Sequence, residues 1–358
     1  MWTVPPGFLD ALTGSHSYTS TVSTYLGDTK LADIPVGGGR VVVDGASQVR
    51  RRAYLSVPEQ QWTDDLSPFG VELRIWVTIG SGTTTFPPVP VFTGRVQTRS
   101  RARRSGLIDV ECWDRFAAIN DDGFEAPEPA PYGSRIVDAI RSLIGETHPG
   151  VSVADMTASN STVPAALTWD YGDGSRGRAI QRMALAIGCE VFALPDGTFL
   201  QRRYPSLDDP PAWSVATGDG GVIVSDVQRE DRSGVANRWI ITGAQTAAAV
   251  TIRETVSITA GPLRYGGPYG RVVRQFSDPM ITSSGQGQQS GRAILARVQG
   301  LARQRRLGVI ANPALEAGDV LAVTTEDGYE LHIADTFEVP LTASTPTMEI
   351  ASRSTAEF

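Results

Sequence analysis

The residues best suited to acid–base chemistry in this chain are its three histidines, His16, His148 and His332. None stands in an H-E-x-x-H segment, and none has a carboxylate that the local sequence would place beside it. The G-x-S-x-G motif, which presents the nucleophile of an α/β-hydrolase, is also absent from the sequence. A triad assembled from distant residues stays open, because triads are recognised by geometry rather than by position. We predict no catalytic residue and expect a protein that is not an enzyme.

Two acidic clusters could suggest a calcium site. One contains Asp170, Asp173 and Ser175, and the other is the run Asn120–Asp121–Asp122. Neither has the spacing of the twelve-residue calcium loop with its closing glutamate. Asp and Asn also favour turns for conformational reasons of their own, and that is the simpler interpretation. We therefore predict no metal site.

Two further features bear on thiol chemistry and on cofactors. Cys112 and Cys189 have no neighbouring Cys or His at metal-binding spacing, so we expect two buried free thiols. The segment Gly285–Gly291 reads G-x-G-x-x-x-G, one residue longer than the dinucleotide fingerprint, with no Walker lysine. We interpret it as a flexible loop that leads to a helix capped by Ser290. No cofactor is predicted.

Arginine supplies all but one of the 32 basic residues of a chain whose net charge is −7. That net charge argues against a general duplex-binding protein, whose surface should be basic. The densest cluster lies on an expected hairpin with the loop 104–106, where Arg101 should face Asp109 and Arg99 should face Glu111. We interpret it as a cross-strand ladder, with contact to nucleic acid, an acidic partner or a neighbouring subunit as the alternative. The cluster comprises Arg95, Arg99, Arg101, Arg103 and Arg104.

A second arginine run, Arg50–Arg51–Arg52, follows the turn Asp44–Gly45. Edge strands commonly carry charge, so we interpret this run as a strand edge or a subunit contact. A patch for specific nucleic-acid binding is the less favoured reading.

Composition indicates an ordinary globular chain of two or three domains. It has 358 residues, of which 41% are hydrophobic and 20% charged. The 37 Gly and 23 Pro favour many turns and short strands. No apolar run approaches the ~18 residues that a membrane span needs, so we expect no integral membrane span.

Hydrophobic periodicity changes twice along the chain. Alternation over 71–79 predicts a half-buried strand in a β-rich first third. Between a proline-rich linker at 125–131 and about residue 210, two amphipathic helices and a tight hairpin predict an α+β unit. The last third returns to β, with one long helix at 288–306. The predicted domains are 1–126, 131–212 and 213–358.

Several segments of the sequence resemble the tail-tip hub proteins of tailed phages that infect actinobacteria. The resemblance covers most of the chain, and the near-absence of lysine agrees with a GC-rich host. The segments that carry it are 39–44, 49–57, 66–70, 91–96, 108–115 and 312–321.

This resemblance implies a fold and a role. Such hubs are similar to the baseplate hub of contractile tails, in which two tube-like β-barrel domains per chain let a homotrimer imitate a six-fold tail tube. The implied fold is mainly β with an α+β insertion: two tail-tube-like β-barrels plus a smaller helix–hairpin domain. The implied role is a structural ring that closes the distal end of the tail tube and lines the DNA ejection channel.

The partners implied are other copies of the chain, the tail tube or distal tail protein, the tape-measure protein, and tip or fibre proteins. DNA would pass without being bound specifically. The implied location is the virion, after synthesis in the host bacterial cytoplasm.

Two other function classes stay open. One is a tail-associated cell-wall hydrolase or peptidase. The other is a host-surface adhesin, in which Trp62, Trp76 or Trp213 would stack on sugars, although isolated tryptophans are more often core or interface residues.

Overall fold

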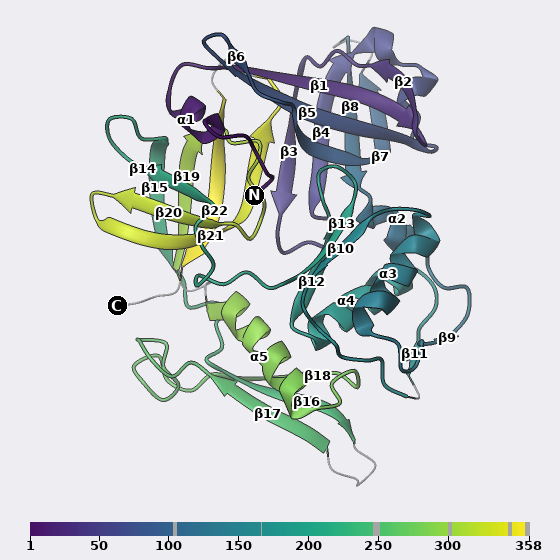
Figure 1. Ribbon diagram of the computed structural model, residues 1–358, viewed down its shortest axis with the longest axis vertical. Helices are drawn as coiled ribbons and strands as arrows, with labels where there is room; N and C mark the ends of the chain where they lie inside the picture. Colours follow the sequence, from purple (N-terminus) through teal and green to yellow (C-terminus); the bar gives the residue numbers. More distant parts are fainter. Residues whose placement is uncertain (103–105, 166, 246–250, 300–302, 343–345, 355–358) are drawn as a thin grey trace.

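The computed structural model describes residues 1–102, 106–165, 167–245, 251–299, 303–342 and 346–354. Figure 1 shows three parts: a large sheet system above, an α+β unit at the lower right, and helix α5 (Ser284–Gln299) over a small sheet below. Within these ranges, the helices include none with the length and apolar character needed to cross a membrane.

One large sheet combines strands from both ends of the chain. They are β1 (Ser17–Leu26), β2 (Thr29–Asp33), β3 (Gly38–Asp44), β4 (Arg51–Pro58), β5 (Val71–Ser81), β6 (Thr84–Thr85), β7 (Val89–Ala102), β8 (Leu107–Asp114), β14 (Trp213–Ala216), β15 (Ile223–Glu230), β19 (Arg303–Ile310), β20 (Val320–Thr325), β21 (Gly328–Pro340) and β22 (Thr347–Ser354). The main path runs β15-β19-β22-β21-β3-β4-β8-β7-β5-β1-β2. β21 pairs with β3, with Phe337 opposite Val43, so the two ends share one ladder. The mainly β prediction is confirmed, but the described strands form no closed barrel.

The alternating pattern of the first third builds the core of this sheet. Val71, Leu73, Ile75, Val77 and Ile79 are each no more than 4% exposed on β5, as the period-two pattern predicts. Their cluster continues into buried residues of β19 to β22, so one core serves both ends of the chain. Short elements cover its margins: α1 (Phe8–Thr13), η1 (Glu59–Gln61) and η2 (Asp64–Leu66).

The predicted hairpin is present as β7 and β8, but its predicted register is wrong. Arg99 faces Val110 and Arg101 faces Ile108, because the register shifts between Val96 and Thr98. The two arginine side chains instead stack on the Trp62 ring, with Cζ 4.4 and 5.0 Å from its centroid. Arg103 and Arg104 lie outside the described residues.

The two predicted helices and the predicted hairpin are present in an α+β unit, whose buried cluster also extends to residues of the C-terminal third, Ile241 among them. Its elements are α2 (Phe116–Asp121), β9 (Glu128–Pro129), α3 (Ile136–Thr147), β10 (Val153–Met156), β11 (Thr168–Trp169), α4 (Ser175–Ala186), β12 (Cys189–Ala193) and β13 (Phe199–Arg203). Ile140 and Ile144 of α3 and Ile180 and Met183 of α4 are fully buried. The expected linker 125–131 is not free, because β9 pairs with β11 inside the unit.

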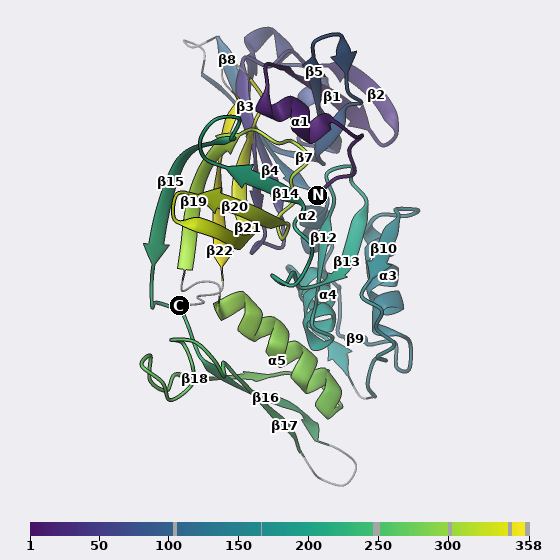
Figure 2. The ribbon, with the colours of Figure 1, turned by 60° about the vertical axis from the view of Figure 1, so that its left-hand side comes forward.

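The long helix lies earlier than predicted. α5 begins at Ser284, so the segment Gly285–Gly291 is helix rather than a loop, and Ser290 is a buried helix residue rather than a cap. It packs on β16 (Arg238–Gln245) and β17 (Thr251–Ser257), as Figure 2 shows, and β18 (Val273–Ser277) pairs with β16 in the same sheet. A Cβ on Gly291 would stand 2.9 Å from side-chain atoms of Ile241 and Val256, so glycine permits this close approach.

The residues expected in the last turn of that helix belong to a strand. Arg303, Arg305 and Arg306 lie in β19, paired with β15 on one side and β22 on the other. β-Sheet pairing on both edges overrides the local helical pattern there.

Candidate functional site

A buried ionic junction lies where the large sheet, the α+β unit and the loop before β20 meet. Arg50, which directly precedes β4, and Arg51, its first residue, are 3% and 2% exposed. Nη2 of Arg50 lies 2.9 Å from Oε2 of Glu190 on β12, and Arg51 pairs with Glu316 of the loop. Arg202 of β13 donates from Nε to Oε1 of Glu190 at 2.8 Å. These five side chains, called the junction below, tie three separate segments of the chain together.

Aromatic and backbone groups complete the junction. The Cζ atoms of Arg50 and Arg202 lie 3.4 and 4.9 Å from the ring centroid of Phe192, which suits cation–π contact. Arg51 donates from Nη1 to the carbonyl of Ala193 at 2.7 Å, and Arg202 donates from Nη2 to that of Ala317 at 2.6 Å. Arg51 and Arg202 therefore have both charged and carbonyl acceptors, as a buried charge requires. Arg50 pairs with Glu190, but its Nε is buried with no hydrogen-bond partner among the described residues.

Burial and charge act in opposite directions on the carboxyls here. Burial alone would raise the pKa of Glu316, but the charges of Arg51, Arg50 and Arg202 hold that pKa below its usual value. Asp114 accepts a hydrogen bond from the backbone N–H of Arg51 at 2.7 Å. Its burial raises its pKa to about 6.

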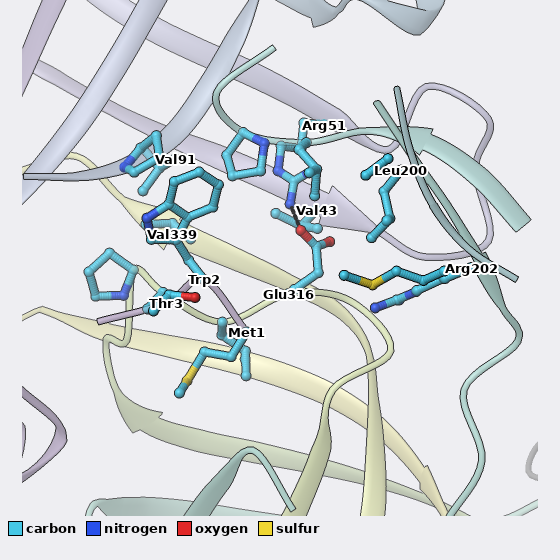
Figure 3. Close-up of a pocket in the computed structure, with 18 residues that line it drawn as sticks. Met1, Trp2, Thr3, Val43, Arg51, Val91, Leu200, Arg202, Glu316 and Val339 are labelled. Carbon is cyan, nitrogen blue, oxygen red and sulfur yellow. Dashed lines mark hydrogen bonds and ion pairs between the residues drawn. The ribbon is translucent and has the colours of Figure 1, made fainter. Parts of the chain in front are cut away.

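A cavity of about 480 Å³ adjoins the junction. Figure 3 shows Arg51 reaching towards Glu316, with Trp2 and Val339 nearby. The wall is mostly apolar, and its described charged side chains, Arg51, Arg202 and Glu316, are paired with one another or with Glu190. The arrangement is suited to holding parts of the protein together, because it offers no unpaired charged group to a ligand.

The interpretation of Arg50–Arg51–Arg52 as a strand edge or subunit contact is wrong for its first two residues. β4 is an inner strand that pairs with both β3 and β8, and Arg50 and Arg51 are buried by the α+β unit and the loop. Arg52 is half-buried and stacks on Trp113, with Cζ 5.0 Å from the ring centroid. Glu190 and Glu316 were not singled out from the sequence; the available signal was a carboxylate inside an otherwise apolar segment.

The structure brings one histidine into a serine–histidine–carboxylate chain. Nε2 of His332 lies 3.1 Å from Oε2 of Glu330, and Nδ1 lies 3.2 Å from Oγ of Ser352. Glu330 is two positions away on the same strand, a partner that the sequence analysis missed. His332 and Ser352 are each 1% exposed, and the serine hydroxyl is also 3.1 Å from the carbonyl of Arg305. A substrate could not reach this buried chain without local opening.

The other candidate residues stay apart from one another. Nε2 of His148 lies 2.9 Å from the carbonyl oxygen of Arg115, and Nδ1 of His16 lies 2.9 Å from that of Gly14. Oγ of Ser175, the first residue of α4, accepts a hydrogen bond from the Phe124 amide at 2.8 Å. Over the described ranges there is no group of three or more His, Cys, Asp or Glu side chains that could hold a metal ion.

The thiols and tryptophans have mainly structural environments. Cys112 and Cys189 are buried and free, as predicted, and burial raises the pKa of each. Trp213 is 3% exposed in the core, whereas Trp76 is half-buried and Trp62 lies under two arginines. Trp213 therefore cannot stack on an external sugar.

Comparison with known proteins identifies the fold. No protein-family model matches the sequence, and no curated protein matches it. Among solved structures, a tail protein from Neisseria meningitidis MC58 has a TM-score of 0.68 at 14% identity, with 94% of this chain and 96% of that chain covered. A 43 kDa tail protein of prophage MuSo2 from Shewanella oneidensis has a TM-score of 0.60 at 13% identity, covering 93% and 98%.

A structure of lower similarity comes from a secretion system rather than from a phage tail. A component of the E. coli type VI secretion system, described as similar to the bacteriophage T4 tail proteins gp27 and gp5, has a TM-score of 0.52 at 8% identity. It covers 100% of this chain and 77% of that one. The chain thus shares the fold of phage tail proteins along nearly its whole length.

Proposed function

We propose that this chain is a structural protein of a phage tail tip or baseplate, in which copies form a ring at the distal end of the tail tube. The observation that carries the proposal is the fold shared with the Neisseria tail protein over 94% of the chain. The buried junction suits such a role, because it fixes three parts of one subunit into a unit that can bear load.

The proposal includes the domain organisation. The segments 1–126 and 213–358 would act as two tube-like β domains and 131–212 as the α+β domain, three chains together imitating a six-fold tube. Each ring would contact the tail tube or distal tail protein on one side and tip or fibre proteins on the other. The tape-measure protein or DNA would occupy the channel, and the net charge of −7 per chain would keep DNA from adhering.

Cryo-electron microscopy of the tail that contains this chain tests the proposal. We expect three copies in a ring at the distal end of the tube. A position on the capsid, or one isolated copy on the side of the tail, would contradict it.

The hydrolase alternative has one observation in its favour, the Ser352–His332–Glu330 chain. Zymography on host cell walls, with wild type beside Ser352→Ala, decides it. We expect no lysis by either form, because the chain is buried. Lysis that the substitution abolishes would establish an enzyme.

A further inference from the structure

Charge is distributed unevenly between two parts of the lower half of the molecule. Residues 116–175, in the α+β unit, contain nine Asp or Glu against two Arg. Residues 232–274, in the β16–β18 unit, contain six Arg against one Glu. A chain of net charge −7 therefore carries one strongly acidic region and one strongly basic region.

The acidic region has an exposed rim. The strand pair β9–β11 and the bond from the Gly172 amide to the Phe124 carbonyl, 2.8 Å, hold the segments 120–128 and 169–174 side by side. Tyr171, on this rim, is 60% exposed. Five exposed carboxylates on these segments have no ion-pair partner among the described residues. They are called the acidic rim and comprise Asp121, Glu125, Glu128, Asp170 and Asp173.

The basic region is organised around two tyrosines of the segment 258–272. Arg238 and Arg271 lie beside the Tyr265 ring, with Cζ 3.4 and 5.9 Å from its centroid, and Arg232 lies 5.4 Å from that of Tyr269. Four arginines here make no ion pair with any described carboxylate, and all but Arg238 are exposed. They are called the basic loop and comprise Arg232, Arg238, Arg264 and Arg271.

The acidic rim and the basic loop cannot neutralise each other within one chain. In Figures 1 and 2 the β9 strand and the loop between β17 and β18 lie on opposite sides of the lower half. Two different, complementary patches on opposite sides of one chain are suited to a head-to-tail contact. Repetition of such a contact closes a ring when the rotation between copies allows it.

We propose that the basic loop of one copy docks on the acidic rim of the next copy, with arginines pairing to carboxylates and stacking on Tyr171. This inference rests on the proposed ring and names the surfaces that form it. Arginine suits both contacts, because its planar fork binds carboxylates and stacks on aromatic rings. A nucleic acid on the basic loop would leave the acidic rim unexplained, so the second copy is the partner that accounts for both patches.

Charge reversal on the full-length chain tests the inference. The basic-loop variant carries Arg232→Glu, Arg264→Glu and Arg271→Glu, and the rim variant carries Glu125→Arg, Glu128→Arg and Asp173→Arg. In sedimentation at about 20 mM salt, we expect wild type to self-associate, and each triple variant to do so roughly 10–100-fold more weakly. An equimolar mixture of the two triple variants should regain association as alternating copies, because the acidic loop of one variant meets the basic rim of the other, and the basic loop of the second meets the acidic rim of the first. A closed ring of three would still contain one contact between like charges.

The variant that combines all six substitutions is the decisive control. Its loop is acidic and its rim is basic, so the contact between successive copies again joins opposite charges. We expect it to recover association to within about tenfold of wild type. Circular dichroism checks that each variant is folded, and any misfolded triple is replaced by the corresponding Arg→Gln or Glu→Gln set.

Each result decides the inference separately from the proposed ring. A wild-type ring that is insensitive to all three variants would overturn the docking surfaces and leave the ring intact. A wild type that stays monomeric at low salt and about millimolar concentration would also overturn the docking surfaces. The proposed ring is tested separately, by cryo-electron microscopy of the tail. Binding of a DNA oligonucleotide that the basic-loop variant abolishes, with self-association unchanged, would assign the basic loop to nucleic acid instead.

Discussion

Two buried arginine networks in this chain differ in what surrounds their partners. In the junction, Arg50 and Arg51 face Glu190 and Glu316, which are only 10% and 7% exposed. In the C-terminal part of the sheet, Arg305 is 1% exposed, but its partners Asp226, Glu330 and Asp327 are 22%, 27% and 78% exposed.

The different exposure of the carboxylate partners determines how much each network contributes to stability. Water can replace a lost partner of Arg305, so that network stabilises one sheet locally. Water cannot easily reach the junction, and its side chains come from segments more than a hundred residues apart. Breaking a sealed pair leaves an uncompensated buried charge, which costs far more than losing an exposed pair.

The largest expected effect comes from Glu316→Gln. We expect a loss of about 3–5 kcal/mol in the free energy of unfolding at neutral pH, because Arg51 and Arg50 stay buried opposite a neutral amide. The native pKa of Glu316 is lowered, so its contribution is full above the ordinary value of 4.5 and is lost as pH falls through the native value. Urea denaturation measures it.

The matched control for that variant is Glu338→Gln, which removes the exposed partner of Arg40. It should change stability by less than about 1 kcal/mol. Equal effects of the two substitutions would show that burial does not govern the junction.

Asp114→Asn gives the next largest effect, seen as a change in pH dependence. The native carboxyl, with its pKa raised to about 6, binds a proton between about pH 4 and 6, where the unfolded one has released it. Ionisation of Asp114 therefore destabilises the native state as pH rises through this window, by roughly 3 kcal/mol. The stability of wild type relative to Asp114→Asn should fall accordingly between pH 4 and 7 and then level off. The control Asp28→Asn, at a fully exposed carboxylate, should leave the free energy of unfolding at neutral pH nearly unchanged.

A smaller effect is expected from Asp226→Asn in the second network. Arg305 keeps Glu330 and Asp327, so the loss should be about 1 kcal/mol in thermal or urea unfolding. Glu349→Gln, which removes an exposed partner of Arg306 in the same sheet, is the control and should cost less. A loss as large as that of Glu316→Gln would remove the distinction between the two networks.

Salt should produce the smallest effect. At 1 M salt the Debye length falls to about 3 Å, so the effect of Asp226→Asn should shrink while that of Glu316→Gln stays nearly constant. Repeating both measurements at low and high salt tests this. Equal sensitivity would mean that solvent ions reach the junction.

Much of the secondary structure could be predicted from the sequence because it follows from local periodicity. The strand at 71–79 is present, and so are the two helices and the tight hairpin predicted between the proline-rich linker and about residue 210. Errors arose where non-local packing overrides a local pattern. The glycines of α5 predict a loop from the local sequence, but they form helix because they allow close packing against β16 and β17. The local pattern at Arg303 and Arg305 predicts helix, but these residues form a strand because β15 and β22 pair with it on both sides.

The sequence alone determined that the chain is β-rich at both ends, α+β in the middle and acidic overall, because these depend on residue types and short spacings. Only the tertiary structure decided that both ends share one sheet, that Arg50 and Arg51 are inside it, and that acidic and basic patches lie on opposite sides. Those features depend on which distant segments meet, and a charge in the sequence does not reveal the partner that buries it.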